Sequence, residues 1–274
     1  MDIRMICMDL DGTALLKDHK TFSPRLTAAL EKAHALGIAI APVTGRPFGL
    51  LPAPLNGHPV WEDLVAVCNG AQVRKLGTGE ILHRLDLPQQ ALVQILELSR
   101  EYDLPVEFSI DSRLHLTRHS LELQQANPGL EFHRNTILPS HGQFVDSLEP
   151  FCQATVEKIN LMCIPEAHSE EISRRLDAMG VSAVRASRTS MEITHGDANK
   201  GNALHHLCRL LDIPPACAMA LGDSGNDEPM LRQAGLGIAM GNAPDYVRLA
   251  ADAVTETNEN DGAAIAIERY ALKE

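Results

Sequence analysis

The sequence lacks the cysteine and histidine patterns that hold zinc. Its six cysteines are scattered with no CxxC pair, and no HExxH pattern accompanies its twelve histidines. A zinc knuckle, a thioredoxin-like redox motif and a zinc hydrolase site are therefore not recognisable. Most of the cysteines lie within apolar runs, as buried thiols do in a reducing compartment. The cysteines thus predict neither a metal site nor a disulfide framework.

Long hydrophobic runs are also missing. No apolar stretch approaches the roughly 18 residues that a membrane-spanning helix needs. The N-terminal run reaches an aspartate at position 9, which is too early for the apolar region of a signal peptide. We therefore expect a cytoplasmic protein that has no membrane partner.

Basic residues are in the minority. The 36 acidic residues outnumber the 24 basic ones and give a formal net charge of −12, with no block of like charges. This balance argues against nucleic acid or an anionic membrane as a partner. It does not argue against a small anionic substrate, because a pocket with one lysine, one arginine and a metal ion is locally positive. Nothing in the pattern indicates an obligate protein partner.

Both ends of the chain show the pattern of a parallel sheet. Apolar runs at 3–8, 38–43 and 216–221 alternate with predicted helices, and each run stops at a polar cluster. Continuous apolar strands between helices are typical of parallel strands that are covered on both faces. With 274 residues, of which 45% are hydrophobic, the chain is long enough for about two domains. We predict an α/β protein with a doubly wound, Rossmann-like core.

The middle of the chain has a different pattern. Residues 106–110 and 114–116 alternate apolar and polar side chains, as an antiparallel hairpin with one wet face does. We therefore predict that an α+β domain is inserted into the core. The predicted insert is 84–189, and the predicted core is 1–83 together with 190–274.

Acidic pairs follow two of the core strands. Asp9 and Asp11 come after the first apolar run, and Asp223 and Asp227 come after the run at 216–221. If these strands are neighbours, the carboxylates converge, which is unfavourable without a cation because like charges disfavour joint ionisation. Oxygen ligands without histidine or cysteine favour a hard ion, most simply Mg²⁺. The sequence thus predicts a Mg²⁺ site beyond the carboxyl ends of the strands.

The same residues suit phosphoryl transfer. A carboxylate such as Asp9 beside Mg²⁺ can attack phosphorus and form an aspartyl phosphate, while Asp11 can protonate the leaving oxygen and later deprotonate water. Thr44, the amide of Gly45 and Lys200 offer donors for the phosphate oxygens. Taken alone, Lys200 is interpreted more simply as a solvated lysine and 44–46 as a turn. Their joint position at strand ends favours a phosphate site.

Six ordered motifs resemble those of the haloacid dehalogenase-like (HAD) hydrolases, specifically the Cof-type, sugar-phosphatase-like family. They are Asp9-Leu10-Asp11-Gly12-Thr13, Thr44-Gly45-Arg46, Asn69-Gly70, Lys200-Gly201, Gly222-Asp223-Ser224-Gly225-Asn226-Asp227 and Met240-Gly241-Asn242-Ala243. The match covers both core segments. The insert resembles, by position and size, that family's α/β cap of the C2B type, which implies that it sets substrate specificity.

The resemblance implies a role for each motif residue. Asp9 is the nucleophile and a metal ligand, and Asp11 is the acid/base, which also binds the metal through its main-chain carbonyl. Asp223 completes the metal ligands, while Asp227 holds a metal-bound water or orients Lys200. The other implied contacts are those to the phosphate from Leu10, Thr44, Gly45, Lys200 and Asn226, and those to the substrate from Arg46, Asn69 and Gly70.

The resemblance also implies an activity, which is Mg²⁺-dependent hydrolysis of small phosphorylated metabolites, such as sugar phosphates, through an aspartyl phosphate. Asp11 argues against a dehalogenase, which has no acid/base two positions after its nucleophile. The alternatives are a phosphomutase of the same fold, a non-catalytic protein that binds phosphorylated metabolites, and a protein-serine phosphatase. The chain departs from the family before Lys200, where a proline and small residues are usual; Asn199 can still cap the helix there.

Overall fold

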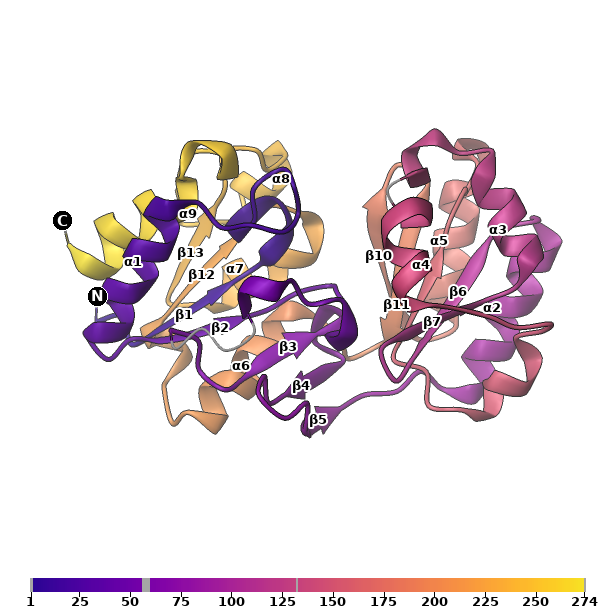
Figure 1. Cartoon of the computed structure of the whole chain (residues 1–274), viewed down its shortest axis with the longest axis horizontal. Helices are drawn as coiled ribbons and strands as arrows, with labels where there is room; N and C mark the ends of the chain where they lie inside the picture. The colour runs from indigo at the N-terminus through magenta and orange to yellow at the C-terminus, as the bar shows by residue number, and fades with distance from the viewer. Residues whose placement is uncertain (1, 56–59, 132, 274) are drawn as a thin grey trace. The chain divides into compact units, whose positions relative to one another are not determined.

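A computed structural model describes residues 2–55, 60–131 and 133–273 and divides the chain into two compact units (Figure 1). The first unit combines both ends of the chain, and the second is inserted between them. The first consists of Met1–Gly45, Leu51–Arg84 and Asn199–Glu274, and the second of Arg46–Leu50 and Leu85–Ala198. Each unit has its own sheet and its own hydrophobic core.

A parallel sheet of five strands forms the centre of the first unit. The strands are β1 (Met5–Met8), β2 (Ala39–Pro42), β12 (Ala218–Gly222), β13 (Leu236–Ala239) and β14 (Ala253–Val254). Their order in the sheet is β14-β13-β12-β1-β2, and Met8 lies opposite both Leu221 and Pro42. Every residue of β1, β2 and β12 is buried. This burial explains why the three strands appear in the sequence as uninterrupted apolar runs.

Helices cover both faces of this sheet. They are α1 (Pro24–Ala35), α6 (Lys200–Leu210), α7 (Glu228–Gln233), α8 (Asp245–Arg248) and α9 (Gly262–Ala266). Ile6 and Met8 of β1 belong to the core that includes α1 and α9, whereas Met5 and Cys7 belong to the core that includes α6 and α7. Alternate residues of one strand therefore point into two cores. This arrangement confirms the predicted doubly wound α/β sheet.

Local signals explain where α1 begins and ends. Ser23 Oγ accepts a hydrogen bond from the backbone N–H of Leu26 at 3.1 Å, and Pro24 occupies the first helical position. Gly37, just beyond the helix, has a φ of +78°. These are the predicted N-cap, first-turn proline and left-handed terminal residue. Neither this helix nor any other in the described ranges is long and apolar enough to cross a membrane.

A small antiparallel sheet adjoins the parallel one in the first unit. Its strands are β3 (Val65–Val67), β4 (Gln72–Arg74) and β5 (Ile81–Arg84). A parallel bridge between Val43 and Ala66 joins β3 to the chain just after β2. The loop after β3, which contains Asn69, therefore lies beside the ends of the parallel strands.

The second unit contains a mixed sheet of six strands in the order β10-β11-β9-β6-β7-β8. The strands are β6 (Val106–Ile110), β7 (Arg113–Leu116), β8 (Gly142–Phe144), β9 (Lys158–Leu161), β10 (Val181–Ser187) and β11 (Ser190–His195), and the helices are α2 (Gln89–Glu101), α3 (Arg118–Gln125), α4 (Leu138–His141) and α5 (Ser169–Ala178). β6 and β7 form the predicted antiparallel hairpin, with Phe108 opposite His115. The prediction that one face of β6 is exposed to solvent is wrong, because Glu107 and Ser109 are buried.

The unit boundaries differ from the predicted ones. We expected 190–274 to belong entirely to the core, but β11 pairs with β9 and β10 in the second unit, so the first unit resumes only at Asn199. Arg46–Leu50 also group with the second unit, where Leu50 packs against the cluster of Leu114 and Leu116. Strand pairing and packing between distant segments set these boundaries, and neither leaves a local pattern in the sequence.

Candidate active site

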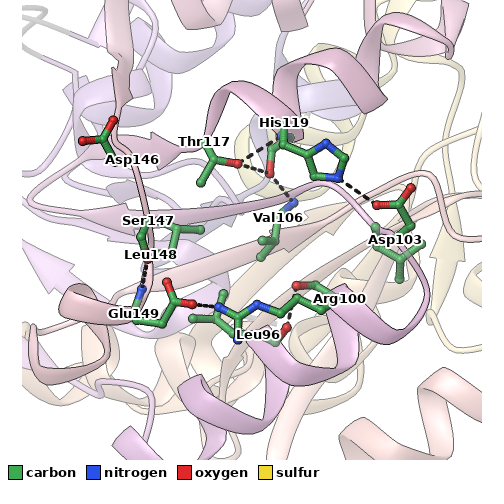
Figure 2. Close-up of a pocket in the computed structure, with 13 residues that line it drawn as sticks. Leu96, Arg100, Asp103, Val106, Thr117, His119, Asp146, Ser147, Leu148 and Glu149 are labelled. Atoms are coloured by element: carbon green, nitrogen blue, oxygen red, sulfur yellow. Dashed lines mark hydrogen bonds and ion pairs between the residues drawn. The ribbon is translucent and has the colours of Figure 1, made fainter.

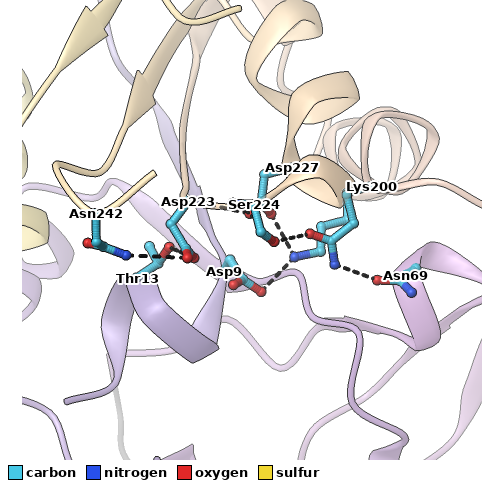
Figure 3. A network of polar contacts seen from close by, with 9 residues as sticks. Asp9, Thr13, Asn69, Lys200, Asp223, Ser224, Asp227 and Asn242 are labelled. Atoms are coloured by element: carbon cyan, nitrogen blue, oxygen red, sulfur yellow. Dashed lines mark hydrogen bonds and ion pairs between the residues drawn. The ribbon is translucent and has the colours of Figure 1, made fainter. Parts of the chain in front are cut away.

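The two acidic motifs meet at one edge of the parallel sheet (Figure 3). Asp9 directly follows β1 and Asp223 directly follows β12, and these strands are neighbours in the sheet. The backbone N–H of Asp9 donates to the carbonyl of Leu221 at 3.0 Å, which extends the parallel pairing as far as the aspartate. Because the strands are parallel, both motifs leave the sheet on the same side. The structure thus brings together carboxylates that are far apart in the sequence.

Lys200 lies between two of these carboxylates. Its Nζ donates to Asp9 Oδ1 and to Asp227 Oδ1, both at 2.6 Å, and the lysine side chain is fully buried. Lys200 is the first residue of α6, where Asn199 Oδ1 caps the helix by accepting from the N–H of Asn202 at 2.8 Å. Lys200 is therefore not the solvated lysine that its local sequence alone would favour.

The loop after β12 wraps around Asp227. Asp227 Oδ2 accepts hydrogen bonds from the backbone N–H groups of Asp223 and Ser224, each at 2.9 Å. A Cβ atom on Gly222 would lie 2.3 Å from the Cβ of Asp227, so this close approach requires glycine. One carboxylate oxygen of Asp227 holds the loop, and the other holds Lys200.

Asp223 is held from two sides. Its Oδ1 accepts from Thr13 Oγ1 at 2.9 Å, and its Oδ2 accepts from Asn242 Nδ2 at 3.3 Å. Asn242 also donates to the carbonyl of Gly12 at 2.9 Å, so it links the loops that follow β1 and β13. Thr13 and Asn242 were not among the predicted site residues. The signal for Asn242 is its place just past the end of an apolar run, the same position that Asp9 and Asp223 occupy.

Asp9, Asp223 and Asp227 form an acidic cluster, in which each contributes an oxygen that lies within 4.8 Å of the other two. Burial raises the pKa of Asp9 well above its ordinary range; Lys200 opposes this shift, and the neighbouring carboxylates add to it. Burial and then the charge of Asp227 raise the pKa of Asp223 to about 6. Burial lowers the pKa of Lys200, but the two aspartates outweigh it and raise that pKa overall.

The donor set fits a hard divalent cation. The cluster has three carboxylates, and the one ammonium group that contacts it among the described residues, Lys200, reaches Asp9 and Asp227. The buried site therefore carries excess negative charge, which is unfavourable unless a cation compensates it. The cluster offers carboxylate oxygens, and in the described part of the chain no histidine or cysteine joins it. This is the ligand chemistry that Mg²⁺ prefers. A bound cation would also reverse the raised pKa of Asp9 and Asp223, because it favours the ionised carboxylates.

Asp11 lies in a different environment from Asp9. Its carboxylate is 37% exposed, it is not part of the acidic cluster, and its Oδ1 lies 2.8 Å from Nδ1 of His19. The negative charge of Asp11 contributes to the raised pKa of both Asp9 and Asp223. Asp11 is thus close enough to influence the cluster electrostatically while it stays accessible to solvent.

The loops after β2 and β3 meet at the same edge of the sheet. The N–H of Thr44 donates to the carbonyl of Ala66 at 2.9 Å, and the N–H of Asn69 donates to the carbonyl of Thr44 at 3.0 Å. Asn226 Nδ2 donates to Asn69 Oδ1 at 2.9 Å, which links these loops to the one after β12 (Figure 3). The structure therefore brings Thr44, Asn69 and Asn226 to the edge that carries Asp9.

The remaining predicted residues differ in their placement. The side chain of Leu10 is buried in the core, so only its backbone is available to a ligand. Gly45 is partly exposed. Gly70 has a φ of +92°, and a Cβ there would lie 2.5 Å from the carbonyl oxygen of Asn199, so it supports the start of α6. Arg46 groups with the second unit, where its Nη1 donates to the carbonyl of Leu50 at 3.1 Å.

A hollow of about 370 Å³ in the second unit has no comparable chemistry (Figure 2). Four of its side chains form two pairs, Arg100 with Glu149 and His119 with Asp103, and Asp146 also lines the hollow. Ser120 Oγ accepts from the backbone N–H of Val106 at 3.3 Å. In the described ranges, the carboxylates of this hollow do not converge as those of the acidic cluster do.

The chain is similar to known proteins over most of its length. The sequence model of the haloacid dehalogenase-like hydrolase family matches residues 6–267. YxeH of Bacillus subtilis is 32% identical over 273 residues, which cover 98% of each chain. HMP-PP phosphatase of Yersinia pestis is 28% identical over 250 residues, covering 88% of this chain and 84% of its own. The solved structure of a phosphatase of the HAD superfamily from Bacteroides thetaiotaomicron matches with a TM-score of 0.83 and 28% identity, covering 99% of this chain and 96% of its own.

Proposed function

The chain belongs to the haloacid dehalogenase-like hydrolases and is a phosphatase of that family, and from this premise we propose that it hydrolyses small phosphorylated metabolites with Mg²⁺ through an aspartyl phosphate on Asp9. One observation carries the proposal: Lys200 contacts Asp9 and Asp227 in a buried cluster that is short of positive charge. A divalent cation supplies the positive charge that such a site lacks, and the cation and Lys200 together can then hold an anionic phosphate monoester.

The proposed metal ligands are the side chains of Asp9 and Asp223 and the main-chain carbonyl of Asp11, with Asp227 nearby. When bound, Mg²⁺ would neutralise charge on the transferring phosphoryl group. Asp227 contacts Lys200 at 2.6 Å through Oδ1, and this contact supports the role of orienting Lys200. Thr13 and Asn242 hold the two oxygens of Asp223, so this ligand is already oriented.

The proposed nucleophile is the carboxylate of Asp9. Lys200 Nζ donates to Asp9 Oδ1 at 2.6 Å, and this hydrogen bond restricts the rotation of the carboxylate. In the first step an Asp9 oxygen bonds to phosphorus, and the bond from phosphorus to the leaving oxygen breaks. Asp11 gives a proton to the leaving oxygen in the same step.

The second step regenerates the enzyme. Asp11, now ionised, takes a proton from a water molecule as the water oxygen attacks phosphorus. The bond between Asp9 and phosphorus then breaks, which releases inorganic phosphate. The exposed position of Asp11 supports this dual role, because a partly exposed carboxylate can meet both the leaving group and incoming water.

The proposed phosphate donors are the amides of Leu10 and Gly45 and the side chains of Thr44, Lys200 and Asn226. The contacts from Asn69 to Thr44 and to Asn226 support a shared phosphate-binding edge. Asn69, Gly70 and Arg46 are proposed to contact the rest of the substrate, and we also propose that the inserted unit selects it. The Yersinia relative is an HMP-PP phosphatase, which supports a small phosphorylated metabolite as the substrate class.

Phosphate release across a panel of phosphorylated metabolites tests this function. The wild-type protein is assayed with Mg²⁺ and with EDTA, beside Asp9→Asn and a matched control, Asp212→Asn, which removes an exposed carboxylate of the same unit. We expect release that requires Mg²⁺ and Asp9 but tolerates Asp212→Asn. Release by Asp9→Asn at the wild-type rate would contradict the nucleophile. Conversion of a sugar phosphate without release of phosphate would indicate a phosphomutase instead.

A trapping experiment tests the covalent intermediate separately. The protein is mixed with a radiolabelled substrate, quenched in acid and then treated with hydroxylamine, which cleaves acyl phosphates. We expect a protein-bound label that hydroxylamine removes and that Asp9→Asn lacks. A label that resists hydroxylamine, or that persists in Asp9→Asn, would place the phosphoryl group on another residue.

A further inference from the structure

Two histidine rings are stacked on each other in the first unit. His83 lies on β5 and His206 lies on α6, and their ring centroids are 3.8 Å apart with an angle of 25° between the planes. Both side chains are half-buried. The stack therefore joins the small antiparallel sheet to a helix that is distant in the sequence.

The two stacked elements flank Leu85–Ala198, the main segment of the second unit. β5 ends at Arg84, and the chain enters this segment at the next residue (Figure 1). The first unit resumes at Asn199, and α6 begins immediately after it. The stack thus connects the last strand before the inserted segment with the first helix after it.

β5 is the edge strand of the small sheet. In the described ranges its strand partner is β4, and this pairing is irregular between Val73 and Arg74. Ile81 and Leu82 of β5 are exposed. A short edge strand with exposed apolar side chains buries little surface, and such segments open locally more readily than the core. The contact of His83 with α6 therefore contributes to holding β5 in place.

The closed stack requires His83 to be neutral. Nε2 of His83 is buried, and no residue in the described ranges forms a hydrogen bond with it. A protonated histidine carries a proton on both ring nitrogens, so it would place a donor at this position without an acceptor. A buried donor without an acceptor is costly. The neutral ring avoids this cost because it carries its single proton on Nδ1.

Other groups on α6 also favour neutral rings. Burial, and then the charge of Arg209, lower the pKa of His83. Burial lowers the pKa of His206 as well, and His83, Arg209 and His205 add to this shift. Protonation of either ring therefore brings a positive charge close to other basic groups.

The strands of the small sheet do not compensate such a charge within the described ranges. Val73 of β4 lies opposite His83 and is apolar. Arg74 and Arg84 directly follow these two residues, so their side chains point to the other face of the sheet. Both are basic in any case. The surroundings of the stack thus oppose protonation from the side of the sheet as well as from the helix.

We infer that the stack of His83 and His206 is a pH-sensitive clamp on the segment that leads into the second unit. While both rings are neutral, the clamp holds the end of β5 against α6, and protonation of the rings releases the strand. The clamp is independent of the proposed function, because its opening and closing are defined by the two rings alone.

The pH dependence of the clamp has a defined sign. The rings bind protons more weakly in the closed stack than in the open state, because their pKa is lowered in the stack. The clamp is therefore fully stable above the ordinary pKa of histidine, about 6.5. Its stability falls as the pH drops below that value and is lowest below the lowered pKa of the stacked rings.

Three variants separate the stacking of the rings from their protonation. His83→Ala removes the stack at every pH. The double variant His83→Phe/His206→Phe keeps two aromatic rings that can stack and removes both titrating groups. His34→Ala is the matched control, because it removes an exposed histidine of the same unit.

The experiment measures amide hydrogen exchange of the full chain at pH 8 and pH 5, with each rate compared with that of an unstructured peptide at the same pH. We expect the protection of the β5 amides in the wild-type protein to be about 10-fold lower at pH 5, the lower end of what one buried donor without an acceptor costs. The double phenylalanine variant should have the same protection at both pH values. His83→Ala should have low protection at both, and His34→Ala should behave as the wild-type protein does.

Two results would overturn the clamp directly. One is equal protection of β5 at the two pH values in the wild-type protein, and the other is a pH dependence that persists in the double phenylalanine variant. The amides of α1, which packs in a different core from α6, serve as the internal reference. An equal loss of protection in α1 at pH 5 would show unfolding of the whole unit and would also overturn the clamp.

The outcome does not depend on how well each variant folds. A thermal unfolding curve checks each protein, and if His83→Ala does not fold, the comparison of the wild-type protein with the double phenylalanine variant still decides. Release of phosphate is not part of the measurement. Failure of the clamp and failure of the proposed function are therefore distinguishable.

Discussion

Two buried carboxylates, Asp9 in the first unit and Glu107 in the second, show how differently a protein can treat the same charge. Glu107 is completely buried on β6, and Asp9 is buried at the end of β1. Burial alone raises the pKa of a carboxylic acid. Asp9 follows this rule and its pKa is raised, whereas the pKa of Glu107 is lowered. The difference lies in what surrounds each group.

Glu107 is fully compensated by hydrogen-bond donors. Its Oε1 accepts from His133 Nε2 at 2.8 Å and from Gln124 Nε2 at 3.0 Å, and its Oε2 accepts from Asn160 Nδ2 at 3.1 Å. Burial opposes ionisation, but the hydrogen bonds and charge of His133 and the bonds from the two amides outweigh it and lower the pKa. We term these four residues the Glu107 network. Because its buried charge is compensated, the network is typical of an interaction that stabilises a fold.

The acidic cluster is under-compensated. Asp9 and Asp227 share one ammonium group, and within the described ranges the carboxylate of Asp223 accepts hydrogen bonds from the hydroxyl of Thr13 and the amide of Asn242. Such an arrangement destabilises the fold unless a ligand completes it, and it is typical of binding and catalytic sites. Burial of charge by itself therefore does not distinguish the candidate site from the Glu107 network. The excess of negative charge distinguishes it.

The largest expected contrast is in activity. Asp9→Asn should lower kcat by at least about 10⁴-fold, because it removes the nucleophile, and it should leave the protein folded because asparagine relieves the excess charge. Glu107→Gln should leave kcat for 4-nitrophenyl phosphate within about 2-fold. Steady-state kinetics on both variants measure the contrast. Loss of activity in a folded Glu107→Gln protein would show that the second unit takes part in the reaction.

The contrast in stability should run the other way. Glu107→Ala leaves three donors of the Glu107 network without an acceptor and creates a cavity, so the free energy of unfolding should fall by about 3 kcal/mol. Asp9→Ala should have a smaller effect, since it also removes repulsion among the carboxylates. Denaturant unfolding in EDTA measures both. A larger loss from Asp9→Ala would mean that its contact with Lys200 outweighs the repulsion.

The pH dependence of the metal-free protein should reveal the opposite pKa shifts. The pKa of Asp223 is raised to about 6, so its protonated carboxyl group stabilises the fold fully below about pH 4. This contribution to the free energy of unfolding, at most about 3 kcal/mol, is lost as the pH rises through about 6. The contribution of Glu107 has the other sign: it is present above the ordinary pKa and is lost as pH falls through the lowered one. Melting temperatures measured in EDTA from pH 4 to 8 should depend less on pH in Asp223→Asn than in the wild-type protein. An unchanged pH dependence would contradict the raised pKa of Asp223.

The smallest expected effect concerns metal affinity. Asn242→Ala should weaken Mg²⁺ binding by about 10-fold, the lower end of what partners of metal ligands contribute, because Asp223 loses the donor on Oδ2. Gln124→Ala, which removes a donor from the Glu107 network, should leave metal affinity unchanged while it lowers the melting temperature. Calorimetric titration of Mg²⁺ into the EDTA-stripped proteins tests the pair. Equal affinities in all three proteins would mean that Thr13 alone orients Asp223.

Much of the fold could be predicted from local pattern. The apolar runs that became β1, β2 and β12 were predicted, and Ser23 and Pro24 open α1 as expected. These features depend on periodicity, turn chemistry and capping within a few residues. The prediction of a solvent-exposed face on β6 was wrong, because Gln124 and His133, which are distant in the sequence, cover Glu107. Its alternating polar residues face a buried network, and a polar residue in a strand carries no mark of which partner it has.

The site divides in the same way. The order of its motifs, and the grouping of Asp9 and Asp223 at the carboxyl ends of strands, follow from the sequence because parallel strands place their ends on one edge. Three contacts do not follow from the sequence: that of Lys200 with two carboxylates, those of the two donors with Asp223, and that of His19 with Asp11. Each depends on the conformation of loops, which is set when distant segments pack together. The extent of the second unit has the same origin, as β11 shows.

By itself, then, the sequence determined which strands form, where each ends and which polar residues stand at those ends, because these depend on neighbours along the chain. Only the tertiary structure decided which of these polar residues are compensated and which are left with excess charge. The physical reason is that burial and electrostatic interaction depend on distances in space, and those distances arise only when separate segments pack together.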